Sequence, residues 1–536
     1  MRKFVFAAVA ALLAVPAAAQ QPPPPKLLVV ISVDQFSADL FDEYRAQFTA
    51  GLARLSEGTV FRNGYQAHAN TETCPGHSTI LTGDHPARTG IIGNSWIDQS
   101  IARADKTVYC AEDPSAPGSS HSHYALSAMQ LRVPTLGELT KARWPASRNV
   151  AVAGKDRAAV MMSGHRADQR WFWDGGRFAT DLSVRQPPSM AVTNAAVARL
   201  LAAPSPALEA PPFCARKAQP IAVAGHAPVG SGAFARSAGD TDAFEGSPAF
   251  DGAILTAAAG LTHVMRLGQG SAPDLLSIGL SATDYVGHYY GTEGQEMCLN
   301  LIELDREIGD FLNYLDSSGV DYAVVLTADH GGQDLPERAR LHGVADAQRV
   351  DSALAASAVS KAIAADLGLT APLLFGDSMG DIYVNRSLSS ADQARVLAQA
   401  LRIYRAHPQV QAVFTRDDLE RVPVPAGSPD TWSLIERARA SFDPQRSGDF
   451  VVILKPHVTP IGHVTKSVAT HGSPWDYDRR VPILFWRPGF RGATVTAPAD
   501  TVDIMPTLAA LIDLPIAAGS VDGHCLDGTP AFCPQP

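Results

Sequence analysis

Several acidic, imidazole and hydroxyl side chains of this chain lie where an apolar run gives way to polar residues. In chain order they are Asp34 at the end of LLVVISVD, Thr73 in TETCPGHSTILTG, Asp284 and His288 in LSATDYVGH, Asp329 and His330 in VVLTADHGG, and His471 in ATHGSPWDYDRRVPIL. Three carboxylates and three imidazoles are ligands that a pair of zinc ions would take, and a hydroxyl is the natural nucleophile beside them. These residue types favour metal-assisted hydrolysis of a phosphate ester.

The spacing within two of these motifs suits a pair of metal ions. Asp284 and His288 are separated by three residues, so both side chains can reach the same ion from one helical turn. Asp329 and His330 are adjacent, and their side chains point in different directions if they follow a strand. Each pair alone could also be a cap or a buried polar network, so the metal site depends on all the motifs together.

Thr73 lies in a segment that reads as a loop running into a helix. Backbone N–H groups at a helix start can hold a phosphate oxygen, which suits a nucleophile at this place. A threonine there could equally be a helix N-cap. Thr71, two residues earlier, is the rival hydroxyl.

Lys155 and Arg157, in VAGKDRAAV, bear on the class of ester. A phosphate monoester presents a nearly dianionic group with an extra non-bridging oxygen, and two cations would stabilise it selectively over a diester. The pair therefore favours a monoester substrate. The alternative is a solvated turn with a surface ion pair.

The elements that must position these residues are apolar runs alternating with helical patterns. Runs typical of strands buried on both faces cover residues 27–34, 149–154, 274–281, 321–327 and 481–486. Residues 297–319 have apolar positions every three or four residues, as a helix would. The alternation predicts an α/β fold with three α/β/α layers and a mostly parallel central sheet.

In such sheets, ligand-binding and catalytic residues gather just beyond the carboxyl ends of the strands. Asp34, Asp284 and Asp329 all fall at such ends, and Lys155 follows the run 149–154 more loosely. This shared position joins motifs that are hundreds of residues apart.

The length that remains after an export signal suits one large core with inserted elements or two to three ordinary domains, and we expect one catalytic domain. A positive start, an apolar stretch and an A-x-A cleavage site read as a signal peptide over residues 1–19. Residues 20–26 form a Pro-rich link, and residues 27–536 form the catalytic domain, with insertions at about 95–270 and 340–470 that build a rim. We therefore expect a periplasmic or secreted protein.

Composition limits the partners of the protein. A net charge of −10 and a pI near 5.9 argue against a nucleic-acid-binding surface, which would be basic. The sequence after the signal has no uninterrupted apolar run of about 18 residues, so we expect no membrane anchor. The expected partners are small-molecule phosphate monoesters, and the expected state is a monomer.

The six cysteines are even in number, which permits disulfides in an exported protein. Cys525 and Cys533 bracket a short tail and are the easiest pair to close. By elimination, we pair Cys74 with Cys110 and Cys214 with Cys298.

Taken together, TETCPGHSTILTG with GIIGNSW, SATDYVGH, TADHGG and THGSPWDYDRRVPI resemble the alkaline phosphatase superfamily. Within it, they resemble the branch with a threonine nucleophile, which includes nucleotide pyrophosphatase/phosphodiesterases and periplasmic threonine-dependent alkaline phosphatases. The resemblance runs from Leu27 to about Pro488. It implies an alkaline-phosphatase-like fold and hydrolysis through a phosphothreonine intermediate.

The resemblance also implies roles for single residues. It makes Thr73 the nucleophile and places Asn94, in GIIGNSW, against a phosphoryl oxygen; without it, a Gly-Asn pair would be read as a turn. Lys155 and Arg157 match a K-x-R pair that the monoesterases have and the diesterases lack. The implied metal ligands are Asp284, His288 and His471 for the first zinc, and Asp34, Thr73, Asp329 and His330 for the second.

Other histidines are expected to be structural or exposed, namely His68, His77, His85 and His463. The ligand types suit zinc but also admit manganese, cobalt or iron. A phosphodiesterase or nucleotide pyrophosphatase is the nearest alternative function, since it shares nearly every site residue except the K-x-R pair. A sulfatase is disfavoured because its modification signature is absent near Thr73, a phosphoglycerate mutase by the export signal and the threonine, and a pure binding protein by the nucleophile.

Overall fold

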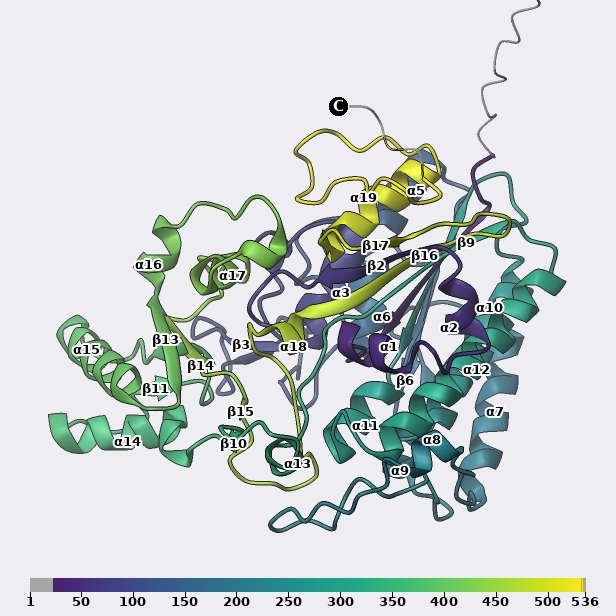
Figure 1. Ribbon diagram of the computed structural model, residues 1–536. Coiled ribbons are helices and arrows are strands. Elements are labelled where there is room, and N and C mark those ends of the chain that lie inside the picture. Colours follow the sequence, from purple (N-terminus) through teal and green to yellow (C-terminus); the bar gives the residue numbers. More distant parts are fainter. Residues whose placement is uncertain (1–22, 532, 534–536) are drawn as a thin grey trace, which may run out of the picture.

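The computed structural model describes residues 23–531 and 533, which fold around a ten-stranded sheet (Figure 1). The centre of the sheet is a block of parallel strands in the spatial order β9 (Tyr322–Thr327), β1 (Leu27–Val33), β8 (Asp274–Leu280), β5 (Asn149–Ala153) and β6 (Gln169–Trp173). Four of these strands coincide with predicted runs, and their residues are buried on both faces. The predicted signal peptide and residues 20–22 of the predicted link lie outside the described residues.

Helices cover both faces of this sheet, which confirms the predicted α/β fold with three layers. Successive residues of β1 point to opposite faces, so Val29 packs in the core under one layer and Leu28 in the core under the other. Figure 1 shows the two groups of helices on either side of the strands. One layer contains α1 (Ala38–Tyr44), α2 (Gly51–Leu55), α7 (Pro188–Ala202), α10 (Pro248–Met265) and α12 (Gln295–Ser317), and the other contains α3 (Thr73–Thr82), α5 (Leu136–Arg143), α6 (Asp156–Ser163) and α19 (Ile504–Leu511).

The predicted strand at 481–486 is β16 (Arg480–Trp486), and it runs against the parallel block. It pairs antiparallel with β9 on one side and with β2 (Thr59–Tyr65) on the other. The start of β16 therefore lies at the same edge of the sheet as the carboxyl ends of the parallel strands. This direction brings the loop that contains His471 to that edge.

Residues 95–270 contribute both to the core and to its surroundings. Strands β5 and β6 and helix α10 from this range belong to the central layers. The short strands β3 (Ser95–Ile97) and β4 (Thr107–Tyr109) instead form a separate antiparallel pair. The range is thus divided between the sheet and its rim.

Residues 340–470 contain a second, four-stranded antiparallel sheet, which forms the lobe on the left of Figure 1. Its strands, in spatial order, are β11 (Leu374–Phe375), β12 (Gly380–Val384), β14 (Phe450–Leu454) and β13 (Val410–Thr415), and its helices are α14 (Ala356–Leu367) and α15 (Ser390–Ala406). This lobe has a hydrophobic core of its own, which includes Ile382, Tyr404 and Phe450. Shorter elements include β7 (Phe178–Ala179), β10 (Gln348–Arg349), β15 (Val458–Thr459), β17 (Thr494–Val495), β18 (Ala499–Asp500), α4 (Pro86–Thr89), α8 (Pro212–Ala215), α9 (Thr241–Glu245), α11 (Ala282–Tyr290), α13 (Pro336–Leu341), α16 (Arg416–Arg421), α17 (Leu434–Ala440) and α18 (Asp476–Arg479).

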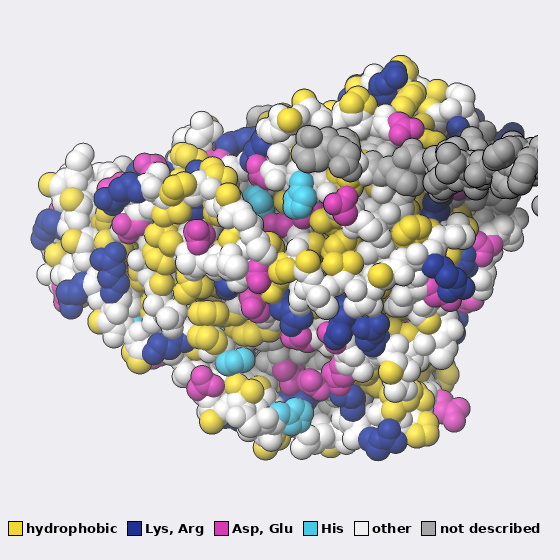
Figure 2. Space-filling view, turned by 45° about the horizontal axis from the view of Figure 1, so that its top comes forward, with side chains coloured by type: hydrophobic (Ala, Val, Ile, Leu, Met, Phe, Trp, Pro, Cys, Tyr) yellow, Lys and Arg dark blue, Asp and Glu magenta, His cyan; other side chains and the backbone are white. Residues whose placement is uncertain are grey.

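The cysteines are paired as predicted. Disulfides join Cys74 to Cys110, Cys214 to Cys298, and Cys525 to Cys533. Within the described residues, no helix has both the length and the apolar character that crossing a membrane requires. Figure 2 shows lysine and arginine side chains interspersed with acidic and apolar ones across the face it presents.

Candidate active site

The sheet brings the predicted site residues to one edge. Asp34 directly follows β1, and Asp329 and His330 follow β9. Asp284 and His288 lie on α11, which begins just after β8. Strands β1, β8 and β9 thus each place site residues just beyond their carboxyl ends, as expected for this class of sheet.

One cluster gathers around Asp284. Its Oδ1 lies 3.4 Å from the Nε2 atoms of both His288 and His471. Its Oδ2 accepts a hydrogen bond from Lys155 Nζ at 2.5 Å. Burial alone would raise the pKa of Asp284, but Lys155 and His288 outweigh this effect and hold the pKa well below its usual range.

A second cluster gathers around Asp329, next to the first. Asp329 Oδ2 lies 3.3 Å from His330 Nε2, and the ring of His330 stacks on that of His471 with centroids 3.6 Å apart. Ligand atoms of Asp34, His77 and Asp329 lie within 4.8 Å of one another, and so do those of Asp284, His330 and His471. His330 therefore bridges the two clusters.

The three predicted histidine ligands share one orientation. The Nδ1 atom of each faces a backbone carbonyl: His288 faces Ala469 at 2.9 Å, His330 faces Gly331 at 2.8 Å, and His471 faces Thr71 at 2.8 Å. When Nδ1–H donates to such a carbonyl, the lone pair of Nε2 is left for a metal ion. Burial also lowers the pKa of His330 well below its usual value, and a neutral ring is the form that binds metal.

Several buried polar atoms at the centre of the two clusters lack a hydrogen-bond partner among the residues that the structure describes. Within the described part of the chain, Asp34 Oδ1, Asp284 Oδ1, Asp329 Oδ2 and His330 Nε2 are buried without a hydrogen-bond partner. Leaving such atoms unsatisfied is costly, whereas divalent cations would coordinate all of them. The donor set, oxygens and imidazole nitrogens without a thiolate, fits zinc.

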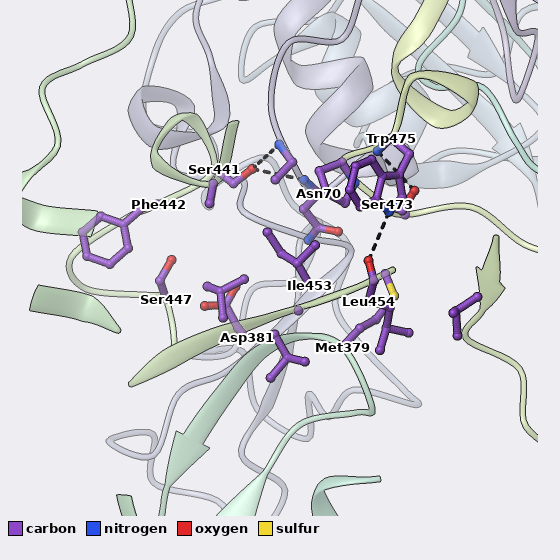
Figure 3. A pocket seen from close by; sticks show the side chains of 18 of the residues that line it. Asn70, Met379, Asp381, Ser441, Phe442, Ser447, Ile453, Leu454, Ser473 and Trp475 are labelled. Atoms are coloured by element: carbon purple, nitrogen blue, oxygen red, sulfur yellow. Dashed lines mark hydrogen bonds between the residues drawn. The ribbon is translucent and has the colours of Figure 1, made fainter. Parts of the chain in front are cut away.

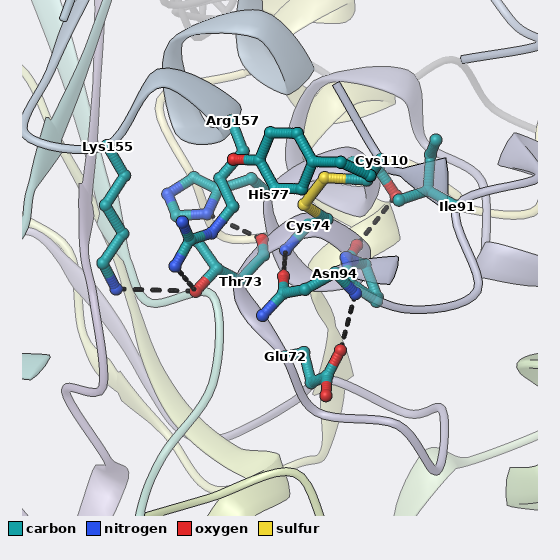
Figure 4. Close-up of a disulfide and its surroundings, with 12 residues drawn as sticks. Glu72, Thr73, Cys74, His77, Ile91, Asn94, Cys110, Lys155 and Arg157 are labelled. Carbon is teal, nitrogen blue, oxygen red and sulfur yellow. Dashed lines mark hydrogen bonds between the residues drawn. A yellow bond between two sulfur atoms is a disulfide. The ribbon is translucent and has the colours of Figure 1, made fainter. Parts of the chain in front are cut away.

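Thr73 is the first residue of α3, and its side chain is fully buried. Its Oγ1 lies 3.5 Å from both Lys155 Nζ and Arg157 Nη2, as Figure 4 shows. The rival hydroxyl of Thr71 instead donates to the carbonyl of Ser473 at 2.8 Å. Of the two threonines, Thr73 is therefore the one that faces the cations.

Gly76, one turn further along α3 than Thr73, lets this helix lie close to the backbone of Asp329. A Cβ atom at Gly76 would lie 1.9 Å from the carbonyl oxygen of Asp329, so a side chain cannot fit there. The helix that carries Thr73 thus packs directly on the backbone of the second cluster.

Asn94 is held by the residues on either side of Thr73 (Figure 4). Its backbone N–H donates to Glu72 Oε2 at 2.6 Å, and its side-chain Oδ1 accepts the N–H of Cys74 at 2.8 Å. Its carbonyl accepts the N–H of Cys110, the disulfide partner of Cys74, at 2.9 Å. With Oδ1 occupied, the side-chain NH2 group is the part of Asn94 left to act as a donor.

Sequence reasoning missed two residues of this arrangement. Glu72 was not considered, and His77 was expected outside the site. His77 Nε2 lies 3.3 Å from Asp34 Oδ1, and its Nδ1 lies 3.3 Å from Asp329 Oδ2. The signal for His77 was its spacing, since residues four apart on a helix share a face and Thr73 is already on that face.

The other three histidines are structural or exposed, as predicted. His68 is fully buried, and His463 is exposed. His85 is buried and lies 2.9 Å from Asp500 and 3.2 Å from Asp522.

Comparisons with known proteins agree with this geometry. A model of the type I phosphodiesterase / nucleotide pyrophosphatase family matches residues 28–474. Alkaline phosphatase PhoK from Sphingomonas sp. is 54% identical over 504 residues, covering 93% of this chain and 90% of PhoK. Alkaline phosphatase PhoD from Zymomonas mobilis is 50% identical over 505 residues, covering 93% of this chain and 87% of PhoD.

The fold has a close counterpart among solved structures. The crystal structure of alkaline phosphatase PafA aligns with a TM-score of 0.82 at 24% identity, and the match covers 95% of this chain and 99% of that one. The chain therefore belongs to the type I phosphodiesterase / nucleotide pyrophosphatase family, has the alkaline-phosphatase-like α/β fold, and is a hydrolase of phosphate esters.

Proposed function

We propose that this chain is an alkaline phosphatase that hydrolyses phosphate monoesters through a covalent phosphothreonine at Thr73. One observation carries the proposal: the Thr73 hydroxyl lies 3.5 Å from two cations, Lys155 and Arg157, beside two clusters of metal-ligating side chains. The related PhoK and PhoD proteins, which are named alkaline phosphatases, support the same activity.

The two clusters would hold two zinc ions. Asp284, His288 and His471 would bind the first, and Asp34, Asp329 and His330 would bind the second together with Thr73. When bound, the ions supply Lewis-acid chemistry, which favours ionisation of a hydroxyl and neutralises charge on oxygens of the ester. Other divalent ions with similar ligand preferences are alternatives.

The side chains of the chain perform the remaining steps. Thr73 Oγ1 attacks phosphorus, so that its bond to phosphorus forms while the bond to the departing alcohol breaks. Water then cleaves the phosphothreonine and releases inorganic phosphate. Lys155, Arg157 and the NH2 group of Asn94 stabilise the charge on the non-bridging oxygens.

The choice between monoester and diester depends on Lys155 and Arg157. Both cations would contact a non-bridging oxygen that a monoester has and a diester replaces with an alkoxy group. The test is the ratio of kcat/KM for p-nitrophenyl phosphate to that for bis-p-nitrophenyl phosphate. We expect the wild type to prefer the monoester and Lys155→Ala/Arg157→Ala to lose that preference; an unchanged ratio would remove the assigned role.

A phosphodiesterase or nucleotide pyrophosphatase is the second candidate, since the matching family model is named for those activities. It would use the same nucleophile and metal ligands. Preference of the wild type for the diester in the same assay would establish this candidate over the first.

The protein would act as a monomer on small-molecule esters in the periplasm or outside the cell. The disulfides agree with an oxidising compartment. Fractionation of the native host, followed by mass spectrometry of the mature N-terminus, would test the predicted export and the cleavage after residue 19.

A further inference from the structure

A cleft of about 1060 Å³ opens directly beside the candidate active site. Its inner end is lined by Glu72, Asn94 and His471, and its walls come from β3 and from the second sheet. We propose that this cleft binds the organic group of the substrate and selects monoesters of flat, aromatic alcohols. The proposal rests on the monoesterase function proposed above and adds the substrate class.

The cleft lies on the side of the site toward which we expect the alcohol to leave. In an in-line displacement, the leaving oxygen lies opposite the attacking oxygen, so the alcohol points away from Thr73. His471, a proposed ligand of the first metal, lines the cleft together with its neighbour Thr470. A substrate with its phosphate between Thr73 and Asn94 would therefore extend its organic group into this space.

The walls of the cleft mix polar and apolar residues, and one part of them is aromatic. Trp96 and Tyr383 belong to a buried hydrophobic cluster, and Phe375 packs against that cluster while remaining partly exposed to the cleft. Rings of this kind bind an aromatic ring by offset or edge contacts. A pocket of this size is also large enough for a bicyclic ring system.

Met379 connects this wall to the metal site. A Cβ atom on Gly472, the residue after His471, would lie 3.4 Å from the methyl carbon of Met379. Figure 3 shows Met379 pointing toward the segment with Ser473 and Trp475, across a small cavity of about 40 Å³. The flexible thioether of Met379 can thus contact both the His471 loop and a ring in the cleft.

Charge in the cleft disfavours a second anionic group on the substrate. Its lining includes three carboxylates, those of Glu72, Asp377 and Asp381, and one lysine, Lys361. A neutral aromatic alcohol fits this balance better than a sugar bisphosphate or a carboxylated alcohol.

A second cavity, of about 630 Å³, is lined in part by Lys155 and Arg157. Its lining, as far as the structure describes the chain, includes Trp173 and Arg177 but none of the proposed metal ligands. It contains neither Asn94 nor His471, the site residues that line the proposed cleft. Arg177, which is largely exposed, therefore provides a matched control.

The experiment measures kcat/KM for 1-naphthyl phosphate and for methyl phosphate, with inhibition by inorganic phosphate as a measure of site integrity. In Phe375→Ala and in Met379→Ala, we expect about a fivefold to tenfold loss with the naphthyl ester. Methyl phosphate turnover and phosphate inhibition should stay within about twofold, because neither places a group in the cleft. Phe375→Leu, which keeps an apolar side chain of similar size, should show a smaller selective loss, and Arg177→Ala should change neither substrate.

The outcomes are distinguishable. Equal losses with both esters, or no loss with either, would overturn the cleft assignment while leaving the monoesterase function in place. Failure of the wild type to hydrolyse either monoester would instead overturn the proposed function, and the substrate class with it.

Discussion

The three histidines predicted as metal ligands, His288, His330 and His471, each have a backbone carbonyl at 2.8–2.9 Å from Nδ1. Sequence motifs predicted these three rings as ligands but contained no information about the carbonyls. Those of Ala469 and Thr71 come from distant segments, and that of Gly331 comes from the residue after His330. His330 could be proposed from the sequence because it lies just beyond the apolar run 321–327. His77 was missed because a histidine inside a helix is usually structural, although its distance of four residues from Thr73 placed both on one face.

At the scale of single residues, the contact of Glu72 with Asn94 gives a testable prediction. Glu72 accepts the backbone N–H of Asn94 at 2.6 Å, so its removal should loosen the group that holds a phosphate oxygen. We expect Glu72→Ala to lower kcat/KM for a monoester about tenfold, near the cost of one charge-assisted hydrogen bond. Glu72→Gln, which keeps an acceptor, should lose less.

A double-mutant cycle separates positioning from a general structural effect. If Glu72 acts through Asn94, the losses from Glu72→Ala and Asn94→Ala should be far from additive. Additive losses would show that Glu72 does not act through Asn94.

At the scale of elements, apolar runs predicted the strands β1, β5, β8 and β9 and the long helix α12 at nearly their observed bounds. The run at 481–486 was also a strand, but its antiparallel direction was not predictable, because an apolar run looks the same read either way. Strands β2 and β6 were missed; each mixes polar or aromatic residues into a short segment. The second sheet was recognised only as an inserted region, since its pairing joins segments about 70 residues apart.

Because α3 packs closely against the residues after β9, adding one methyl group at Gly76 should destabilise the protein. In Gly76→Ala the new Cβ would meet the carbonyl of Asp329 at 1.9 Å, so α3 must move away from the second cluster. We expect a loss of about 1–3 kcal/mol in unfolding free energy and weaker metal retention. Thermal unfolding and metal analysis after dialysis would measure both.

Gly252 on α10 is the matched control. The three atoms nearest to a Cβ there would all belong to the carboxylate of Glu307, the end of a flexible side chain. Gly252→Ala should therefore leave stability nearly unchanged or slightly raised. Equal behaviour of the two variants would contradict the packing account.

At the scale of the whole molecule, His85 joins α4 to the C-terminal region through Asp500 and Asp522. Burial alone would lower the pKa of His85, but the two carboxylates outweigh it and raise the pKa to about 10. In the unfolded chain the pKa of a histidine is about 6.5. The ion pairs of His85 therefore contribute their full stabilisation below about pH 6.5, and this stabilisation is lost as the pH rises toward 10.

We therefore expect the stability difference between the wild type and His85→Gln to shrink between about pH 6.5 and 10. Urea unfolding at several pH values would measure it. A difference that stays constant or grows over this range would contradict the ion-pair assignment.

Removal of metal should affect the whole fold as well as activity. Without cations, the buried carboxylates of Asp34, Asp284 and Asp329 lie close together and lose their compensating charge. We expect EDTA to abolish turnover and lower Tm by several degrees, and zinc to restore both. Full activity of the metal-free protein would contradict the two-metal site.

The most direct test of the central claim is the stereochemical course at phosphorus. A monoester made chiral with oxygen isotopes is transferred by the enzyme to an acceptor alcohol, and the configuration of the product is determined. Attack by Thr73, followed by attack of the acceptor on the phosphothreonine, comprises two in-line displacements and predicts overall retention. Inversion would mean that the acceptor attacks the ester directly, and would contradict a covalent intermediate on Thr73.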